Sequence, residues 1–158
     1  MRNYNNIDKC MDKILGCNCG EGMKEEMYAL LRVVTGFSFL YHGWSKVFGE
    51  MGVAGFAGML KGLNVPATEL VAYLVSYGEL LGGLALILGI FTHWVSKIYI
   101  IIMLGAIFLV HFANGYNGMN GGYEYQLLLL VLGFFFLTHG AGKYSLDAKR
   151  AAKSNSGL

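Results

Sequence analysis

Charged residues are scarce in this chain. Asp, Glu, Lys and Arg together make up 14% of its 158 residues, whereas soluble domains carry about 25%. Apolar residues make up 55%, and the mean hydropathy is +0.49. This composition argues against a soluble globular fold, because so little polar surface could not cover so much apolar content. A net charge of only +2, with no basic stripe, also argues against a nucleic-acid partner.

Cysteine is rare as well. The three cysteines, Cys10, Cys17 and Cys19, all precede the first apolar stretch, and an odd number in a polar segment predicts no disulfide framework. They are only weak candidates for a soft-metal site, since no histidine lies near them, and we expect no metal centre. The sequence also lacks a Cys-x-x-Cys pair, a phosphate-binding loop, a nucleophile elbow and a haem-attachment motif. These absences exclude a four-helix thiol-disulfide oxidoreductase and leave no evident cofactor motif.

Four apolar stretches of about 20 residues dominate the chain. At a rise of about 1.5 Å per residue, a helix of this length matches a hydrocarbon core about 30 Å thick. The sequence therefore predicts an all-α membrane protein, an antiparallel bundle of four transmembrane helices. The predicted spans are residues 27–48, 69–91, 94–113 and 123–141.

The connections between the spans carry signals of their own. Residues 50–68 have apolar side chains at helical spacing, which predicts a short interfacial helix between the first two spans. Residues 114–122 contain three Asn-Gly pairs, which favour turns with positive φ. Lys and Arg concentrate near both termini, so the positive-inside rule predicts cytoplasmic termini in a multi-pass protein of the cell membrane. The predicted parts are a polar cytoplasmic tail with the cysteines over 1–26, a membrane domain over 27–142 and a basic cytoplasmic tail over 143–158.

Ionisable residues inside the spans are the most informative feature. A charge at the bilayer centre costs roughly 2.5–3.5 kcal/mol, so such residues usually face the protein interior and often mark function. On the second span Glu79 shares a face with small residues such as Gly83, close to Gly78-x-x-x-Gly82. We expect this face to pack against the polar stripe of the first span. The ionisable residues are Arg32, His42, Lys46, Glu79, Lys97, His111, Glu124 and His139.

The predicted orientation assigns depths to these residues. Glu79 lies near the middle of the bilayer, and four other ionisable residues lie in the outer half of the bilayer. Two carboxylates, two histidines and a lysine at one level would form a hydrogen-bonded site able to exchange protons. The candidate site consists of His42, Glu79, His111 and Glu124, with Arg32 and Lys46 as charge partners.

Simpler interpretations stay open at this point. Lys46 and Glu124 lie near span ends, where long charged side chains can reach the interface. In the corresponding interpretation of Glu79, this residue is a protonated or paired packing residue. Metal binding by His42 and His111 is not expected, because no His-x-x-x-His or Glu-x-x-His pair shares a helix face.

A series of motifs runs in order through residues 27–148. They are Leu31-Arg32, His42-Gly43 with Lys46 and Phe48-Gly49, Pro66, Glu79-Leu-Leu-Gly82-Gly83, Gly89-x-x-Thr92, His111, Asn120-Gly-Gly-Tyr-Glu124 and Gly140-Ala-Gly142-x-Tyr-Ser-Leu-Asp147. This pattern resembles the DoxX family of small four-helix prokaryotic membrane proteins. Residues 1–26 fall outside the resemblance.

The resemblance implies a membrane component of a redox-linked complex. Some DoxX proteins are linked to quinone-coupled sulfur oxidation, and others resemble membrane partners of superoxide dismutase and a thiol-handling enzyme in oxidative-stress complexes. A quinone or quinol would then lie near His42, Glu79 and His111, with electrons supplied by a protein partner. Whether the chain is itself an enzyme stays open.

Two other classes of function are compatible with the sequence. A non-catalytic scaffold would use the polar network only to fix the register of its helices, inside a bilayer and next to other proteins or copies of itself. A small-solute transporter is less attractive, because four helices leave little room for a pathway.

Overall fold

The structure, a computed structural model, describes residues 21–155. Every regular element in this range is helical, which confirms the all-α class. The elements are α2 (Glu21–Phe48), α3 (Gly52–Gly62), α4 (Thr68–Leu88), α5 (Thr92–Gly105), the π-helical η1 (Ala106–His111), the 3-10 turns η2 (Phe112–Asn114) and η3 (Gly118–Asn120), α6 (Glu124–His139) and α7 (Leu146–Asn155).

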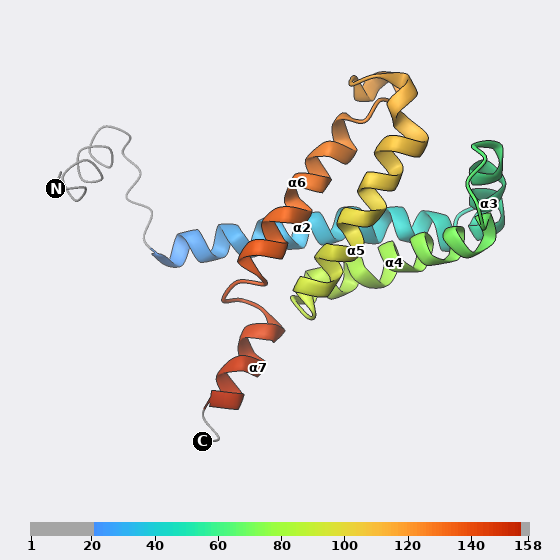
Figure 1. The fold of residues 1–158 in the computed structure, drawn as a ribbon. Coiled ribbons are helices and arrows are strands. Elements are labelled where there is room, and N and C mark those ends of the chain that lie inside the picture. The colour runs from blue at the N-terminus through green and yellow to red at the C-terminus, as the bar shows by residue number, and fades with distance from the viewer. Residues whose placement is uncertain (1–20, 156–158) are drawn as a thin grey trace, which may run out of the picture.

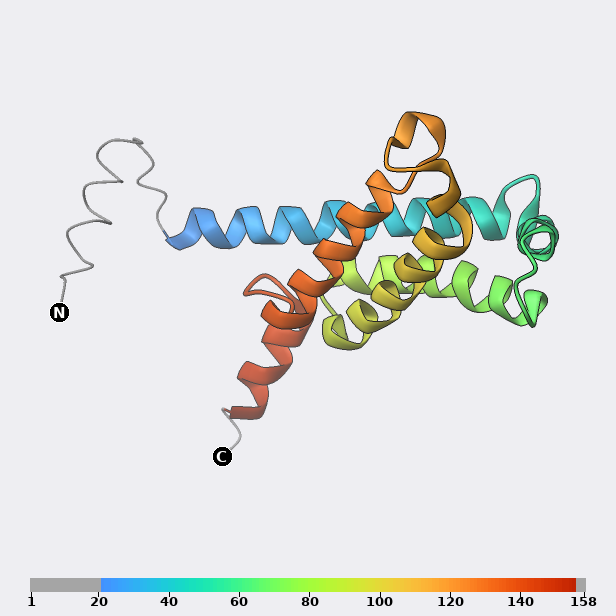
Figure 2. The same ribbon diagram turned by 45° about the horizontal axis from the view of Figure 1, so that its top comes forward.

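Two helical hairpins form the body of the protein. α2 and α4 lie side by side and antiparallel, and α5 and α6 form a second pair that crosses them obliquely (Figure 1, Figure 2). α4 and α5 diverge from the short turn that joins them, as the arms of a V. In place of four nearly parallel helices, the protein therefore has crossed hairpins.

Glycines let α2 and α4 touch through their backbones. A Cβ atom added to Gly43 would lie 2.6 Å from the Cα of Leu80, and one added to Gly83 would lie 2.8 Å from the Cα of Leu40. Both distances are far shorter than a van der Waals contact, so only glycine fits at these two positions. The predicted pairing of the first two long helices, with Gly83 on the shared face, is confirmed.

The hydrophobic core joins the two hairpins. The Tyr99 ring on α5 stacks on the Phe39 ring of α2, with centroids 3.5 Å apart, and both side chains are 1% exposed. Gly82 makes room for this pair, because a Cβ there would lie 2.9 Å from the Tyr99 hydroxyl. Gly82 therefore faces α5, and close packing against α2 is left to other small residues of α4.

The lengths of the helices bear on the membrane prediction. α4 has 21 residues and the continuous run Thr92–Asn114 has 23, and both are long and apolar enough to cross a bilayer. α6, also apolar, is shorter at 16 residues, and α2 is longer at 28 but includes Arg32 and several charged residues in its first turns. The described residues therefore hold two candidate membrane spans, which is consistent with a helical membrane protein.

The short helix expected between the first two spans is confirmed as α3. Its Leu60 is 4% exposed and clusters with Val65 and Ala72, while Val53 and Phe56 pack against this cluster. The apolar side chains at helical spacing therefore bind α3 to the start of α4, at one end of the α2–α4 pair (Figure 1).

The Asn-Gly segment forms a compact loop between the π-helical stretch and α6. Gly115 and Gly121 have φ values of +74° and +77°, as the Asn-Gly pairs predict, whereas Gly118 starts the turn η3. Glu124 closes the loop, since its Oε2 accepts a hydrogen bond of 3.0 Å from the N–H of Gly118. This loop supplies the carbonyl that orients His111.

A clasp, residues 140–147, ties the end of α6 to α2. The guanidinium of Arg32 donates hydrogen bonds to the carbonyl oxygens of Ala141 and Tyr144, the second at 2.6 Å. The Tyr28 hydroxyl donates to the first carbonyl of the clasp at 2.7 Å. Arg32 is only 3% exposed, so its charge is held by backbone oxygens inside the protein.

The clasp also fixes the turn between α4 and α5. Asp147 accepts hydrogen bonds of 3.0 Å from the N–H groups of Phe91 and Thr92, which begin α5, and its own N–H donates to Gly89 at 2.9 Å. A carboxylate at this position satisfies unpaired donors and complements the positive end of the helix dipole. Part of the predicted tail 143–158 is thus an anchored helix, α7.

Replacing Asp147 with alanine should release α7 from the start of α5. Loss of a capping carboxylate costs about 1–2 kcal/mol, so we expect hydrogen exchange of the α7 amides to accelerate roughly tenfold, as measured by mass spectrometry. The control is Lys149→Ala, which alters an exposed residue of the same helix. Equal protection of α7 in both variants would contradict the assigned role of Asp147.

Candidate functional site

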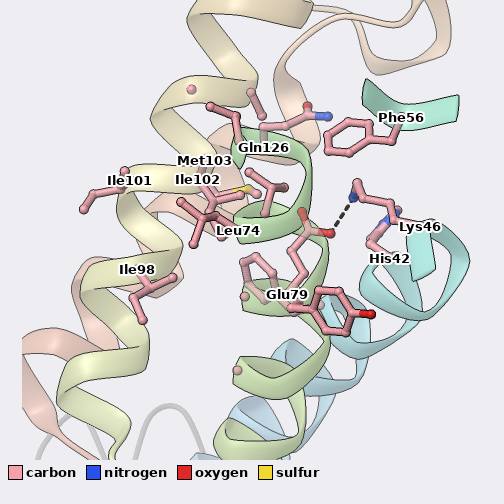
Figure 3. Close-up of a pocket in the computed structure, with 18 of the residues that line it drawn as sticks. His42, Lys46, Phe56, Leu74, Glu79, Ile98, Ile101, Ile102, Met103 and Gln126 are labelled. Atoms are coloured by element: carbon pink, nitrogen blue, oxygen red, sulfur yellow. Dashed lines mark hydrogen bonds and ion pairs between the residues drawn. The ribbon is translucent and has the colours of Figure 1, made fainter. Parts of the chain in front are cut away.

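A cavity of about 1200 Å³ lies between the diverging arms α4 and α5, and α2, α3 and α6 complete its walls (Figure 3). Its lining is mainly aliphatic and aromatic, with Leu74 on α4, Ile98 and Ile102 on α5 and Leu129 on α6 among its residues. Ligand pockets usually measure about 300–1,000 Å³ and combine apolar walls with a few polar groups. The cavity is therefore large enough for a lipophilic ring compound with part of its tail.

One ion pair stands in the cavity wall. The Lys46 ammonium on α2 binds the Oε2 atom of Glu79 on α4, and Figure 3 shows the two side chains pointing toward each other. The Glu79 side chain is only 5% exposed, against 23% for Lys46. Lys46 also lies over the Phe56 ring, 5.4 Å from its centroid. The sequence left open whether Lys46 reaches the interface from the end of its span. The structure shows its ammonium paired with Glu79 instead.

His42 lies one helical turn before Lys46 and lines the same cavity. Its ring is 5.8 Å from the Tyr125 ring of α6 and 5.9 Å from the neighbouring Tyr41 ring, centroid to centroid. His42 and Tyr125 therefore bring groups able to exchange protons to the cavity from two helices.

His111 reaches the cavity from the far end of the α5 helical run. It ends the π-helical stretch Ala106–His111, a wider helical form that often occurs at functional sites. Its Nδ1 lies 2.7 Å from the carbonyl oxygen of Gly121, and its Nε2 lies 3.0 Å from the amide nitrogen of Gln126. The imidazole is thus held on both sides, by the loop and by α6.

The structure brings together four of the six candidate residues. His42, Lys46, Glu79 and His111 all line the cavity. The other two lie elsewhere: Arg32 is bound by the clasp, and Glu124 closes the Asn-Gly loop.

The lining also includes polar residues that the sequence did not single out, among them Tyr125 and Gln126. Gln126 is the single glutamine of the chain and stands just before the apolar run of α6. A lone amide at the start of an apolar helix was the signal that could have drawn attention to it.

Metal ligands do not gather in the described part of the chain. Within residues 21–155, no group of three or more His, Cys, Asp or Glu side chains could hold a metal ion. The weak candidates Cys10, Cys17 and Cys19 lie outside the described residues.

With this geometry established, comparison with known proteins identifies the family. The family model named DoxX matches residues 27–112, from the start of the apolar part of α2 to the end of the π-helical stretch. The chain belongs to the DoxX family. The match includes Arg32, His42, Lys46, Glu79 and His111, whereas Glu124 and Gln126 lie beyond it.

Curated relatives extend this result. The chain is 35% identical over 100 residues to the protein named "Putative oxidoreductase CatD" from Bacillus subtilis, an alignment covering 63% of this chain and 70% of CatD. It is 33% identical over 125 residues to an uncharacterized protein from Haemophilus influenzae, covering 77% of this chain and 88% of that protein. No solved structure matches the chain. The conclusion on the function of this DoxX-family protein therefore rests on the geometry of the cavity.

Proposed function

We propose that this DoxX-family protein is the membrane component of a redox-linked complex and holds a quinone or quinol in the cavity between α4 and α5. One observation supports this above all: an apolar cavity of about 1200 Å³ has an ion pair and two histidines in its lining. A quinone-class ligand needs apolar walls for its ring and tail and polar groups for its oxygens. Its reduced form also needs groups that accept or return protons.

The chain's own residues have distinct roles in this proposal. The Lys46–Glu79 pair and His42 supply a charged, proton-exchanging wall on the α2–α4 side. His111 offers a second such group on the α5–α6 side. Electron transfer belongs to a protein partner, and the name of the relative CatD, which contains the word oxidoreductase, is in keeping with a redox setting.

The test is direct ligand binding. Decyl-ubiquinone should bind the purified protein in lipid nanodiscs saturably, as measured by equilibrium dialysis. We expect Glu79→Gln to weaken binding about tenfold, because it removes the charge that holds Lys46 in the wall. Glu69→Gln is the matched control, since Glu69 is an exposed carboxylate on the same helix. Absence of saturable binding to the wild-type protein would contradict the proposal.

The proposed setting is the cell membrane, with four spans and both termini in the cytoplasm. The support is that Arg32, the α4–α5 turn and the clasp meet at one end, whereas α3 and His111, which contacts the loop at Gly121, line the cavity. Such an arrangement suits helices that alternate in direction across a bilayer.

A scaffold is the second candidate, and α7 favours it. This helix is fixed by Asp147 and extends away from the crossed hairpins (Figure 2). An anchored, projecting helix is suited to contact a soluble partner. A pure scaffold would co-purify with redox proteins from the native membrane yet bind no quinone in the dialysis experiment.

A further inference from the structure

The cavity between α4 and α5 opens to the outside of the protein. Leu81 on α4 and Ile101 on α5 belong to its lining, yet they are 61% and 70% exposed. Leu74 and Ile98, on the same two helices, also combine a place in the lining with an exposed side chain. Other parts of the protein would shield the wall of a closed cavity from the outside. The exposure of these four residues therefore indicates an opening between α4 and α5, here called the mouth.

Two glycines of the lining keep side chains out of the way at the mouth. A Cβ added to Gly78 on α4 would lie 3.4 Å from the Cδ1 of Ile102 and 3.7 Å from the Cγ2 of Ile98, both on α5. These are ordinary van der Waals distances, so the two helices still approach each other here. One turn after Ile102, a Cβ added to Gly105 would meet no atom within 4 Å. At Gly105 the lining therefore faces open space.

The ion pair of the cavity lies away from the mouth. Figure 3 shows Lys46 on one side of α4, and Ile98 and Ile101 on the other. Glu79 points toward Lys46, on the side of α2. The four side chains of the mouth, in contrast, are all aliphatic. A ligand that extends across this cavity therefore fits best with its polar end near α2 and an apolar end at the mouth.

We propose that the mouth is a lateral portal occupied by the hydrocarbon tail of the ligand. The ring lies in the cavity with its oxygens toward α2, and the tail leaves between α4 and α5 to join the hydrocarbon of the bilayer. A tail covers the exposed aliphatic side chains of the mouth, which are unsuited to contact with water. The ligand class is a lipophilic ring with one long tail, which enters from the membrane. The inference rests on the proposed function, because it assigns a path to the tail of the proposed quinone.

A portal of this kind makes affinity independent of tail length. Methylene groups beyond the mouth lie among lipid chains both before and after binding, and lipid chains are as apolar as a leucine side chain. These groups therefore add nothing to the affinity when the amount of ligand is expressed per lipid. A closed cavity would instead exclude any tail longer than the cavity itself.

The experiment compares three quinones that share one ring, on the protein in lipid nanodiscs. They are decyl-ubiquinone, decaprenyl-ubiquinone and dimethoxy-methyl-benzoquinone, which is the ring without a tail. Binding is measured from the rise in Tm with the amount of quinone per lipid, because a ligand of the folded state stabilises it. We expect the wild-type protein to bind the two tailed quinones with affinities within about twofold of each other.

Gly105→Phe is expected to obstruct the mouth. The new ring would extend from the lining into open space, so we expect it to weaken both tailed quinones about tenfold and the tail-free ring little. The matched control is Leu104→Phe, which adds a ring at the neighbouring position, outside the lining of the cavity. It should leave all three affinities unchanged.

The outcomes separate this inference from the function on which it rests. A wild-type protein that binds decyl-ubiquinone but excludes decaprenyl-ubiquinone would overturn the portal and leave the proposed function standing. The portal would also be overturned if Gly105→Phe weakened the tail-free ring as much as the tailed quinones, or weakened none of them. No binding of any quinone would overturn both. The wild-type comparison decides the matter even where the variant does not fold.

Discussion

Replacing Gly83 with alanine is expected to destabilise the protein strongly. The new Cβ would lie 2.8 Å from both the Cα of Leu40 and the carbonyl oxygen of Gly36, which are backbone atoms of α2. The two helices would have to separate, since neither contact can be relieved by a side-chain rotation. Overpacking typically costs about 1–3 kcal/mol, and we place this case at about 3 kcal/mol, a fall in Tm of roughly 10 °C.

The control for this experiment is Gly105→Ala. Gly105 is also a helical glycine in an apolar run, but a Cβ added there would meet no atom within 4 Å. Alanine has the higher helix propensity, so Tm should stay the same or rise slightly. Thermal melts of both variants in the same detergent give the comparison. Equal melting temperatures would contradict the backbone contact between α2 and α4.

Replacing Lys46 with methionine is the second change with a large expected effect. It leaves the carboxylate of Glu79, 4% exposed, without its cation. Removing one partner of a buried ion pair costs about 3–5 kcal/mol, whereas an apolar replacement of both partners is often nearly neutral. We therefore expect Lys46→Met to lower Tm strongly and the double variant with Glu79→Gln to recover most of the loss.

A double-mutant cycle of thermal stabilities measures this coupling. The control is Lys61→Met, which removes the charge of an exposed lysine on α3 and should change Tm little. Simple additivity of Lys46→Met and Glu79→Gln would show that the two side chains do not depend on each other.

Much of the fold was predictable because its signals are local. The apolar runs and the helical spacing in residues 50–68 identified the long helices and α3. The face shared by Glu79 and Gly83 pointed to the packing of α4 against α2, since small residues there have no other evident use. The pairing of Lys46 with Glu79 could also be predicted, because both side chains are charged and had to avoid lipid.

The remaining features depend on contacts between residues far apart in the chain. Arg32 was expected to serve the site, but its partners are carbonyls more than 100 residues away in the clasp. Glu124 is a carboxylate inside a predicted span and was therefore expected in the site, yet its hydrogen bond is to the loop beside it. Sequence periodicity gives the face of a helix but not its crossing angle, so the V of α4 and α5, and with it the cavity, could not be predicted.

The most direct test of the proposed site is photoaffinity labelling. The protein in native-like lipid would be exposed to a photoreactive quinone analogue, and the labelled residues would be located by mass spectrometry. We expect label on cavity residues such as Leu129 and Ile102, competed away by excess decyl-ubiquinone. Label confined to outward-facing residues such as Val34 and Phe37 on α2, with no competition, would contradict a quinone site between α4 and α5.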